Sequence, residues 1–305
     1  MTRLFLVLIL SSLSILAYAF EKGGIADRVI DGTNTVKIIR SNSNTYESEV
    51  HIPETVTYAG KTFTVVEISM GAFYNCKGLH TIYIPKTVRT LNRNLEVGAF
   101  ENSSVVNVII DSETPMTEIP FACFKGSKLE KINFPPSITT IEEFAFANCD
   151  NLTEISIPPT INNIWPYAFD GPKWRQLQIT IEQSPSPLSL ACGDADQGPI
   201  SNRSLYLTIK RPISYKNVGS RGIGLINWGP VWWLEFAGYG SLSNYIPSGH
   251  EEIITIKERT RPSRISEKNI NLINKVKCKL LVPKDLVGLY EVAPYWSEFH
   301  NIQGY

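Results

Sequence analysis

The sequence predicts a β-rich repeat solenoid with short parallel strands, an N-terminal β-hairpin cap and degenerate C-terminal coils. Three observations predict it: a short motif built on Ala-Phe recurs, a stretch of alternating apolar residues follows it, and the copies of the motif are evenly spaced. The steps between the shared phenylalanines are 27, 24, 22 and 23 residues, a period typical of stacked coils. These phenylalanines are Phe73, Phe100, Phe124, Phe146 and Phe169.

Residues 1–19 have the composition of a secretory signal peptide. Arg3 precedes an apolar run over residues 4–16, and Ala17-Tyr18-Ala19 satisfies the small-x-small rule for cleavage. We therefore expect an exported protein, secreted or held at the cell surface, whose mature chain begins at Phe20. No later stretch reaches about 18 uninterrupted apolar residues, so no membrane span is expected after cleavage. The alternative interpretation is an uncleaved membrane anchor.

Composition indicates a neutral, soluble chain. The 305 residues include 29 Lys plus Arg and 29 Asp plus Glu, and removal of the signal peptide takes away only Arg3, which leaves a net charge of −1. Nucleic acids and anionic membranes usually require a basic surface, so neither is an expected partner. The length allows two domains, but a repeat array favours one elongated body.

The segment 20–68 is predicted to cap the N-terminal end of the solenoid, whose core and strand edges would otherwise be exposed. One hairpin is expected between residues 29–30 and 36–39, around the turn residues 31–34. A second is expected between residues 48–52 and 62–66, around residues 59–61.

The repeats proper occupy residues 69–183. Period-two alternation, as in Ile155-Ser156-Ile157, predicts strands with isoleucines facing the core and polar residues facing out. The recurring phenylalanines should form an internal column, each ring burying about 150–250 Å², and the Asn or Gly after each suits a tight turn. They are interpreted as structural. Outward strand positions include Tyr83, Asn107, Ile109, Asn133 and Ser156.

The pattern Leu-x-x-Ile-x-Ile-Pro-x-x-Val-x-x-Ile-x-x-x-Ala-Phe-x-Asn-Cys, as over residues 129–149 and 152–169, resembles the BspA-like leucine-rich repeat of bacterial surface and secreted proteins. The resemblance is specific in four or five coils, strong over about a third of the chain and weak over most of the remainder. It implies a solenoid of surface-exposed repeats and an association with adhesion to other macromolecules. It implies no catalytic residues.

Residues 184–305 are predicted to hold degenerate coils. Alternation persists over residues 177–181, 205–209 and 253–256, and a long loop is expected over residues 184–187 and 192–198. Near the C-terminus, Trp296, Phe299 and Ile302 recur every three residues, which predicts an apolar helical face that closes the core. These three side chains are interpreted as a cap in preference to a ligand site.

The segment from Gly219 to Gly249 interleaves glycines with aromatic residues and is the candidate binding surface. Tyr and Trp supply contact area at low entropic cost, which suits recognition of a protein or a carbohydrate. Two interpretations stay open, contact with a ligand or packing against the side of the solenoid. The candidate ligand-binding residues are Trp228, Trp232, Trp233, Tyr239 and Tyr245.

The cysteines do not predict a metal site. Cys76 and Cys149 hold the same position in coils three steps apart, roughly 14 Å from each other, too far for a disulfide. Cys123 replaces an inward alanine and is expected to be buried. Cys192 and Cys278 are the one pair whose positions leave a disulfide open. No Cys-x-x-Cys or Cys/His cluster occurs, so no structural zinc is expected.

No motif predicts catalysis or a cofactor. The chain has no Gly-x-Ser-x-Gly, and none of its four histidines lies in a motif that needs it; His80 takes a variable, outward repeat position. The predicted function is therefore non-catalytic binding to proteins or glycans. The alternatives are a structural envelope component and a glycan hydrolase that uses Glu251 or Glu252 beside the aromatic segment.

Overall fold

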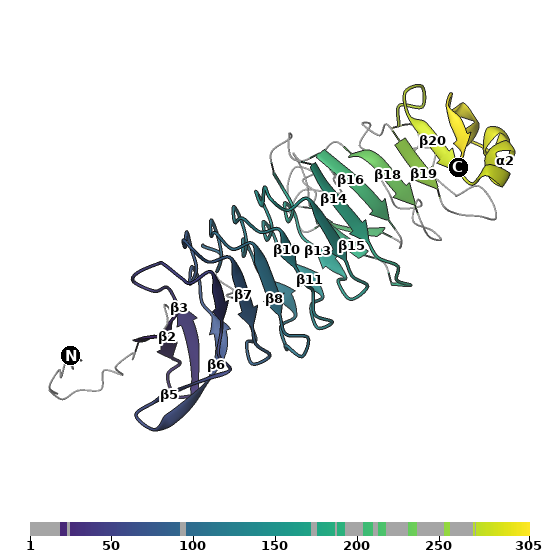
Figure 1. Ribbon diagram of the computed structural model, residues 1–305. Helices are drawn as coiled ribbons and strands as arrows, with labels where there is room; N and C mark the ends of the chain where they lie inside the picture. The colour runs from purple at the N-terminus through teal and green to yellow at the C-terminus, as the bar shows by residue number, and fades with distance from the viewer. Residues whose placement is uncertain are drawn as a thin grey trace.

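The coils stack along one axis into an elongated body (Figure 1), with antiparallel strands at the N-terminal end and the helix α2 (Val287–Val292) at the other. The structure, a computed structural model, describes residues 19–22, 25–91, 96–171, 176–186, 188–192, 204–209, 213–217, 231–236, 253–256, 271 and 273–305. The predicted signal peptide lies outside the described residues, apart from Ala19.

The N-terminal sheet has the order β1-β2-β3-β6-β5. Its first hairpin is confirmed, because β2 and β3 pair antiparallel around the predicted turn. The second hairpin is formed by β5 and β6, and its turn is Ala59-Gly60 with φ of 47° and 75°, both in the left-handed region that tight hairpins require. The strands are β1 (Ala19–Lys22), β2 (Ile25–Val29), β3 (Thr35–Ile39), β5 (Thr55–Tyr58) and β6 (Lys61–Ile68).

The expectation that residues 48–52 form the first strand of the second hairpin was wrong. These residues contain β4 (Glu49–His51), which pairs in parallel with β7 and so belongs to the coil face. A two-residue turn joins the strands that flank it directly, and Pro53 separates β4 from that hairpin.

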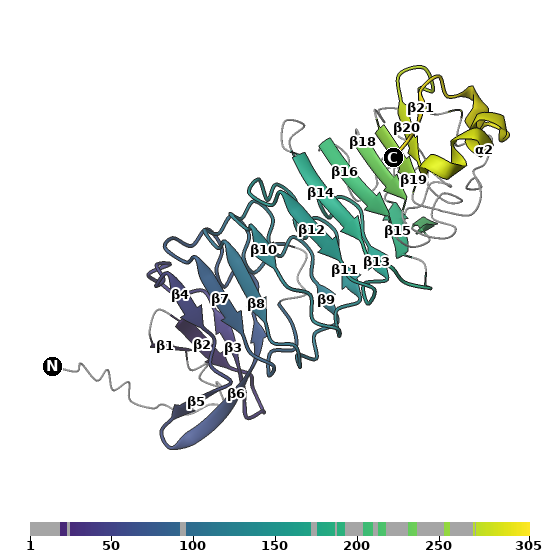
Figure 2. The same ribbon diagram turned by 45° about the vertical axis from the view of Figure 1, so that its right-hand side comes forward.

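Parallel strands from successive coils form the main face of the solenoid, in two sheets of order β10-β8-β7-β4 and β12-β14-β16-β18-β19-β20-β21 (Figure 2). Strands were predicted at most of these positions, and residues 177–181, 205–209 and 253–256 are confirmed as strands. The strands after β4 are β7 (Thr81–Ile84), β8 (Asn107–Ile110), β10 (Lys131–Ile132), β12 (Glu154–Ile157), β14 (Gln176–Ile181), β16 (Ser204–Ile209), β18 (Val231–Phe236), β19 (Ile253–Ile256), β20 (Lys279–Val282) and β21 (Ile302–Gly304).

A second face carries the parallel sheet β17-β15-β13-β11-β9. The long loop expected over residues 184–198 is interrupted by β15, whose Leu188 is fully buried. The prolines and glycines that flank it concealed a short alternating stretch. The strands are β9 (Glu118–Ile119), β11 (Thr140–Ile141), β13 (Asn163–Ile164), β15 (Leu188–Cys192) and β17 (Ile213–Asn217).

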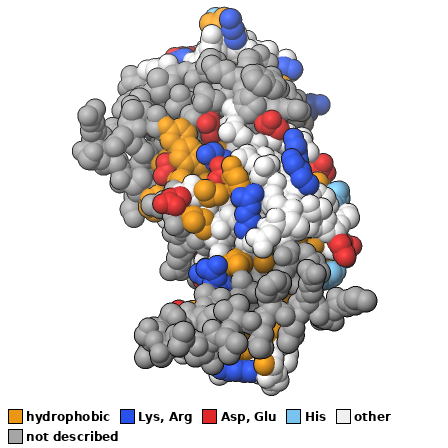
Figure 3. Space-filling view, turned by 90° about the vertical axis from the view of Figure 1, so that its left-hand side faces the viewer, with side chains coloured by type: hydrophobic (Ala, Val, Ile, Leu, Met, Phe, Trp, Pro, Cys, Tyr) orange, Lys and Arg blue, Asp and Glu red, His pale blue; other side chains and the backbone are white. Residues whose placement is uncertain are grey.

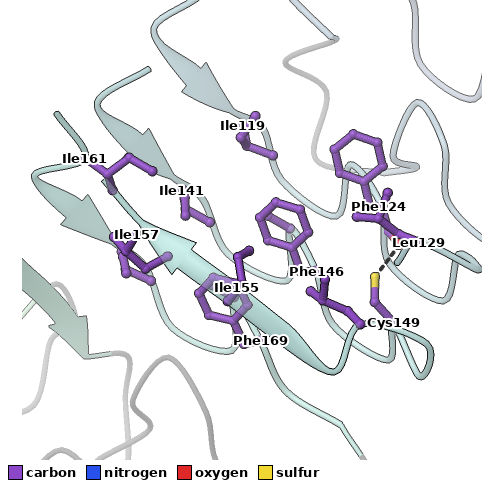
Figure 4. Close-up of a cluster of buried hydrophobic side chains, with 14 of the residues drawn as sticks. Ile119, Phe124, Leu129, Ile141, Phe146, Cys149, Ile155, Ile157, Ile161 and Phe169 are labelled. Atoms are coloured by element: carbon purple, nitrogen blue, oxygen red, sulfur yellow. Dashed lines mark hydrogen bonds between the residues drawn. The ribbon is translucent and has the colours of Figure 1, made fainter. Parts of the chain in front are cut away.

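The five phenylalanines form the expected internal column, and all are buried. Figure 4 shows the part of the column that contains Phe124, Phe146 and Phe169. Successive ring centroids lie 5.0, 5.2, 5.6 and 5.3 Å apart in stacked pairs. Tyr46 extends the column toward the cap, 4.9 Å from Phe73. The column joins neighbouring coils, because each ring from Phe73 to Phe146 packs between the rings of the coils on either side.

The residues after the phenylalanines close tight turns, as expected. Asn75, Asn102 and Asn148 have φ of 51°, 56° and 55°, and Gly126 has φ of 68°. The thiols of Cys76, Cys123 and Cys149 are buried beside these turns, and Cys149 donates to the carbonyl of Phe124 over 3.0 Å. Cys278 is a buried thiol, and the side chain of Cys192 lies outside the described residues.

The C-terminal cap buries Tyr290, Trp296 and Phe299, but not on one helical turn. Tyr290 belongs to α2, Trp296 to the short helix η2 (Trp296–Glu298), and Ile302 to the strand β21. The expected helical face over residues 296–302 was therefore wrong beyond its first turn. Phe299 has extended backbone that ends η2, and β21 continues the main face by pairing with β20.

Candidate functional site

The main face is interrupted between β10 and β12. β10 pairs with β8, and β12 pairs with β14, but the two do not pair with each other. The same coils remain joined at their turns. The N–H of Phe124 donates to the carbonyl of Ala145 and the N–H of Gly126 donates to the carbonyl of Ala147, each over 2.8 Å. The coils therefore stay stacked on one side while their strands separate on the other.

The side chain of Asn133 accounts for the early end of β10. Its Oδ1 accepts from the N–H of Ile110 and its Nδ2 donates to the carbonyl of Ile110, both over 2.7 Å. The amide thus replaces the ladder bonds that the backbone would make there, and Pro135, two residues later, has no N–H to resume the ladder. The chain leaves the sheet after Ile132.

This break exposes core positions. Ile132 and Phe134 are half-buried, whereas the equivalent Ile82 and Ile84 are at most 2% exposed. Phe134 lies edge-on to Phe146, with ring centroids 6.2 Å apart. Together with Ile155 they line a groove of about 570 Å³, hereafter the β10–β12 groove.

The rim of the β10–β12 groove is polar. Glu130, Lys131, Glu154, Gln178 and Thr180 line it beside Ser156, and all but Thr180 are exposed. The Ser156 hydroxyl donates to Glu182 over 2.8 Å, which brings a third glutamate close to this rim.

The strand edge of β12 also faces the groove. Gln178 donates its N–H to Thr153 over 2.8 Å, and Glu182 donates to Ile157 over 2.9 Å. Because backbone groups alternate in direction along a strand, Glu154 and Ser156 direct their N–H and C=O groups away from β14, toward β10. The groove thus combines an apolar floor with backbone donors and acceptors that no neighbouring strand pairs.

A second hollow, of about 620 Å³, lies between the N-terminal sheet and β4. Asp27, 4% exposed, lines it and accepts a hydrogen bond from the Tyr58 hydroxyl, and burial raises the pKa of the Asp27 carboxyl. At its mouth His51 contacts Glu49 over 2.8 Å and stacks on Tyr83 with centroids 4.0 Å apart. No cluster of three or more metal-ligating side chains occurs within the described part of the chain.

The predicted ligand-binding residues fall largely outside what the structure describes. Trp228, Tyr239 and Tyr245 lie outside the described residues, as do the glutamates of the hydrolase alternative, Glu251 and Glu252. The backbone at Trp232 and Trp233 is part of β18, which pairs with β16 and β19. That part of the aromatic segment thus supplies one coil strand of the main face.

Sequence reasoning missed the β10–β12 groove. Its signal was present in Ile132-Asn133-Phe134, where the large aromatic Phe134 replaces the second isoleucine of the Ile-x-Ile found in sister coils. Asn133 was assigned to the outward set, and its amide instead binds the neighbouring backbone. His80 is exposed, as expected for a variable repeat position.

Seen from the N-terminal end, the described surface intersperses acidic and basic side chains (Figure 3). This agrees with the neutral composition, and the described part of that face has no extended area of one charge. Among the described residues, no helix combines the length and apolar character needed to cross a bilayer.

Comparison with known proteins identifies the repeat. A family model described as the BspA type leucine rich repeat region matches residues 13–95 and 61–176 in 6 copies, which together span more than half of the chain. No curated protein matches.

Among solved structures, a leucine-rich repeat protein from Bacteroides ovatus is similar at 20% identity and TM-score 0.45, covering 94% of this chain and 77% of its own. A leucine-rich cell surface protein from Faecalibacterium prausnitzii shares 14% identity at TM-score 0.38, with 94% of each chain covered. The pneumococcal vaccine antigen PcpA shares 13% identity at TM-score 0.40, covering 95% of this chain and 98% of its own.

Proposed function

Because the chain belongs to the BspA-type leucine-rich repeat family, we propose that it is an exported, secreted or cell-surface protein that binds another protein without catalysis. The observation that carries this proposal is the β10–β12 groove, where the main face exposes apolar core positions beside open backbone groups. Exposed apolar surface with a polar rim is typical of protein recognition.

The stacked coils support this function physically. The phenylalanine column and the parallel ladders hold the walls of the groove on regular elements, so little ordering would be needed on binding. Outward positions of a repeat vary freely while the core is retained, which suits recognition.

The test is a binding screen of residues 20–305 against purified secreted and extracellular-matrix proteins and a glycan array. Ser156→Trp would place an indole at the groove, and Ile109→Trp is the matched control at the same strand position in β8. We expect a protein ligand whose affinity falls about tenfold or more with Ser156→Trp, by loss of at least 1.4 kcal/mol, and is kept with Ile109→Trp. Equal affinity of both variants would contradict the groove as the site.

The aromatic segment is the second candidate binding site, favoured by its density of Trp and Tyr. Trp228→Ala, Trp232→Ala and Trp233→Ala belong in the same screen, each checked for folding by circular dichroism. Binding to glycans that is lost in these variants and kept in Ser156→Trp would place recognition there. Turnover of a glycan by the purified chain, abolished by Glu251→Gln or Glu252→Gln, would support the hydrolase alternative. Absence of any partner would favour the structural envelope component.

A further inference from the structure

We propose that the β10–β12 groove takes an extended polypeptide segment, which adds as a strand to the open edge of β12. This rests on the proposed function, that the groove binds a protein. The segment would alternate apolar and polar residues and carry lysine or arginine among its polar ones.

Open backbone groups line both walls of the groove. Glu154 and Ser156 point their N–H and C=O groups into the groove, and on the far wall the alternation of β10 directs those of Ile132 toward it. A folded partner surface or a small apolar ligand would cover these groups without pairing them, at a cost in desolvation. An extended chain pairs them with its own N–H and C=O groups, as strand addition does elsewhere.

The floor of the groove is apolar. Ile132 and Phe134 lie two residues apart on the same side of the chain and stay half-buried. A strand laid along this groove points every second side chain to the floor, so its apolar residues would meet these two and Ile155. The spacing of the exposed core positions thus matches that of a strand and not of a helix.

The rim of the groove carries more acidic than basic side chains. Glu130 and Glu154 line the groove, and Glu182 lies next to Ser156, against one basic residue, Lys131. The outward side chains of an added strand would lie among these carboxylates. Lysine or arginine at those positions is therefore favoured, and acidic residues are disfavoured.

The chain's own repeat leaves the position unfilled for a local reason. The side-chain amide of Asn133 is hydrogen-bonded to the N–H and the C=O of Ile110. Pro135 and Pro158, which follow β10 and β12, have no N–H to donate to a ladder. Closing the groove by direct pairing of β10 with β12 would have to displace Phe134, whose ring lies against Phe146.

The test begins with a displayed library of peptides about ten residues long, selected on residues 20–305 and counter-selected on Ser156→Trp. A selected peptide is resynthesised with N-methyl groups on its even or its odd residues. In strand addition one set of N–H groups faces Glu154 and Ser156 of β12, whereas the other set meets only Ile132 of the shorter β10. Methylation of the first set should therefore lower affinity about tenfold or more, and methylation of the second set should lower it clearly less. Equal effects of the two sets, or no peptide that depends on the groove, would overturn the proposal.

Amide hydrogen exchange supplies the readout on the protein. In the free chain the amides of Glu154 and Ser156 should exchange fast while those of Ile155 and Ile157, which face β14, are protected; the bound peptide should slow only the first pair, about tenfold or more. Protection of Glu154 and Ser156 in the free chain that grows with protein concentration would identify a second copy as the occupant and overturn the proposal.

The two hypotheses fail in different ways. If Ser156→Trp abolishes protein binding but the two methylated peptides lose affinity equally, strand addition is rejected and the proposed function still holds. Binding that Ser156→Trp leaves intact rejects the groove itself.

Discussion

At the scale of the residue, the turns after the phenylalanines depend on side chains that tolerate the left-handed region. Asn148 is exposed and has φ of 55°, so its substitution tests backbone conformation with little change in packing. We expect Asn148→Ala to lower the free energy of unfolding by about 1 kcal/mol, and Asn148→Gly to cost less. Chemical denaturation of both variants measures this, and an Ala variant as stable as the Gly variant would contradict it.

A second residue-scale prediction concerns pH. Burial raises the pKa of Asp27 above its ordinary value of 3.8, so the folded chain holds this proton more tightly than the unfolded chain. Stability should therefore fall as pH rises from about 4 through the folded-state pKa, and Asp27→Asn should remove that fall. The comparison is the free energy of unfolding of both proteins across this range. If the two free energies of unfolding differ by the same amount at every pH, the protonation of Asp27 does not change on unfolding.

At the scale of the element, the main face is open where one strand, β10, is shorter than its neighbours β8 and β12. β12 runs for four residues and β10 for two, and the phenylalanine column widens to 5.6 Å between the same coils. The element is thus determined as much by its ladder partners as by its own alternation.

Truncation of two aromatic rings tests this difference. Phe146 is fully buried, so Phe146→Ala should cost about 3–5 kcal/mol in transfer and cavity terms. Phe134, on the groove floor, is half-buried, and Phe134→Ala should cost about half as much. Equilibrium unfolding in urea compares the two. Equal losses would mean that the groove is closed in solution.

At the scale of the whole molecule, the solenoid is a stack whose ends have to be covered. Trp296 is 2% exposed over the last coils, in edge-on contact with Tyr290, with ring centroids 5.5 Å apart. Trp296→Ala should uncover the C-terminal end of the core, with binding of a hydrophobic dye and faster amide exchange in β20 and β21 before the phenylalanine column unfolds. Val292→Ala is the control, because Val292 is 77% exposed. Exchange that rises uniformly along the chain would contradict an end effect.

Much of the architecture could be predicted because its determinants are local. Alternation in Ile155-Ser156-Ile157 sets which side chains face in, and the asparagines after the phenylalanines set where each turn closes. The first strand of the second hairpin was mispredicted because residues 48–52 and 55–58 both alternate, and only pairing in space distinguishes them.

The sequence by itself determined the repeat, the phenylalanine column and most strands of the main face, since the alternation and the turn residues that specify them lie within one coil. The tertiary structure alone decided where the main face opens. That opening depends on the Asn133 amide, which reaches across to Ile110 in the preceding coil, and on the Phe134 ring, which lies against Phe146. Two strands form a hydrogen-bonded ladder only when they lie at the right distance from each other. That distance depends on the side chains packed between the two coils, so the sequence of one strand alone does not determine it.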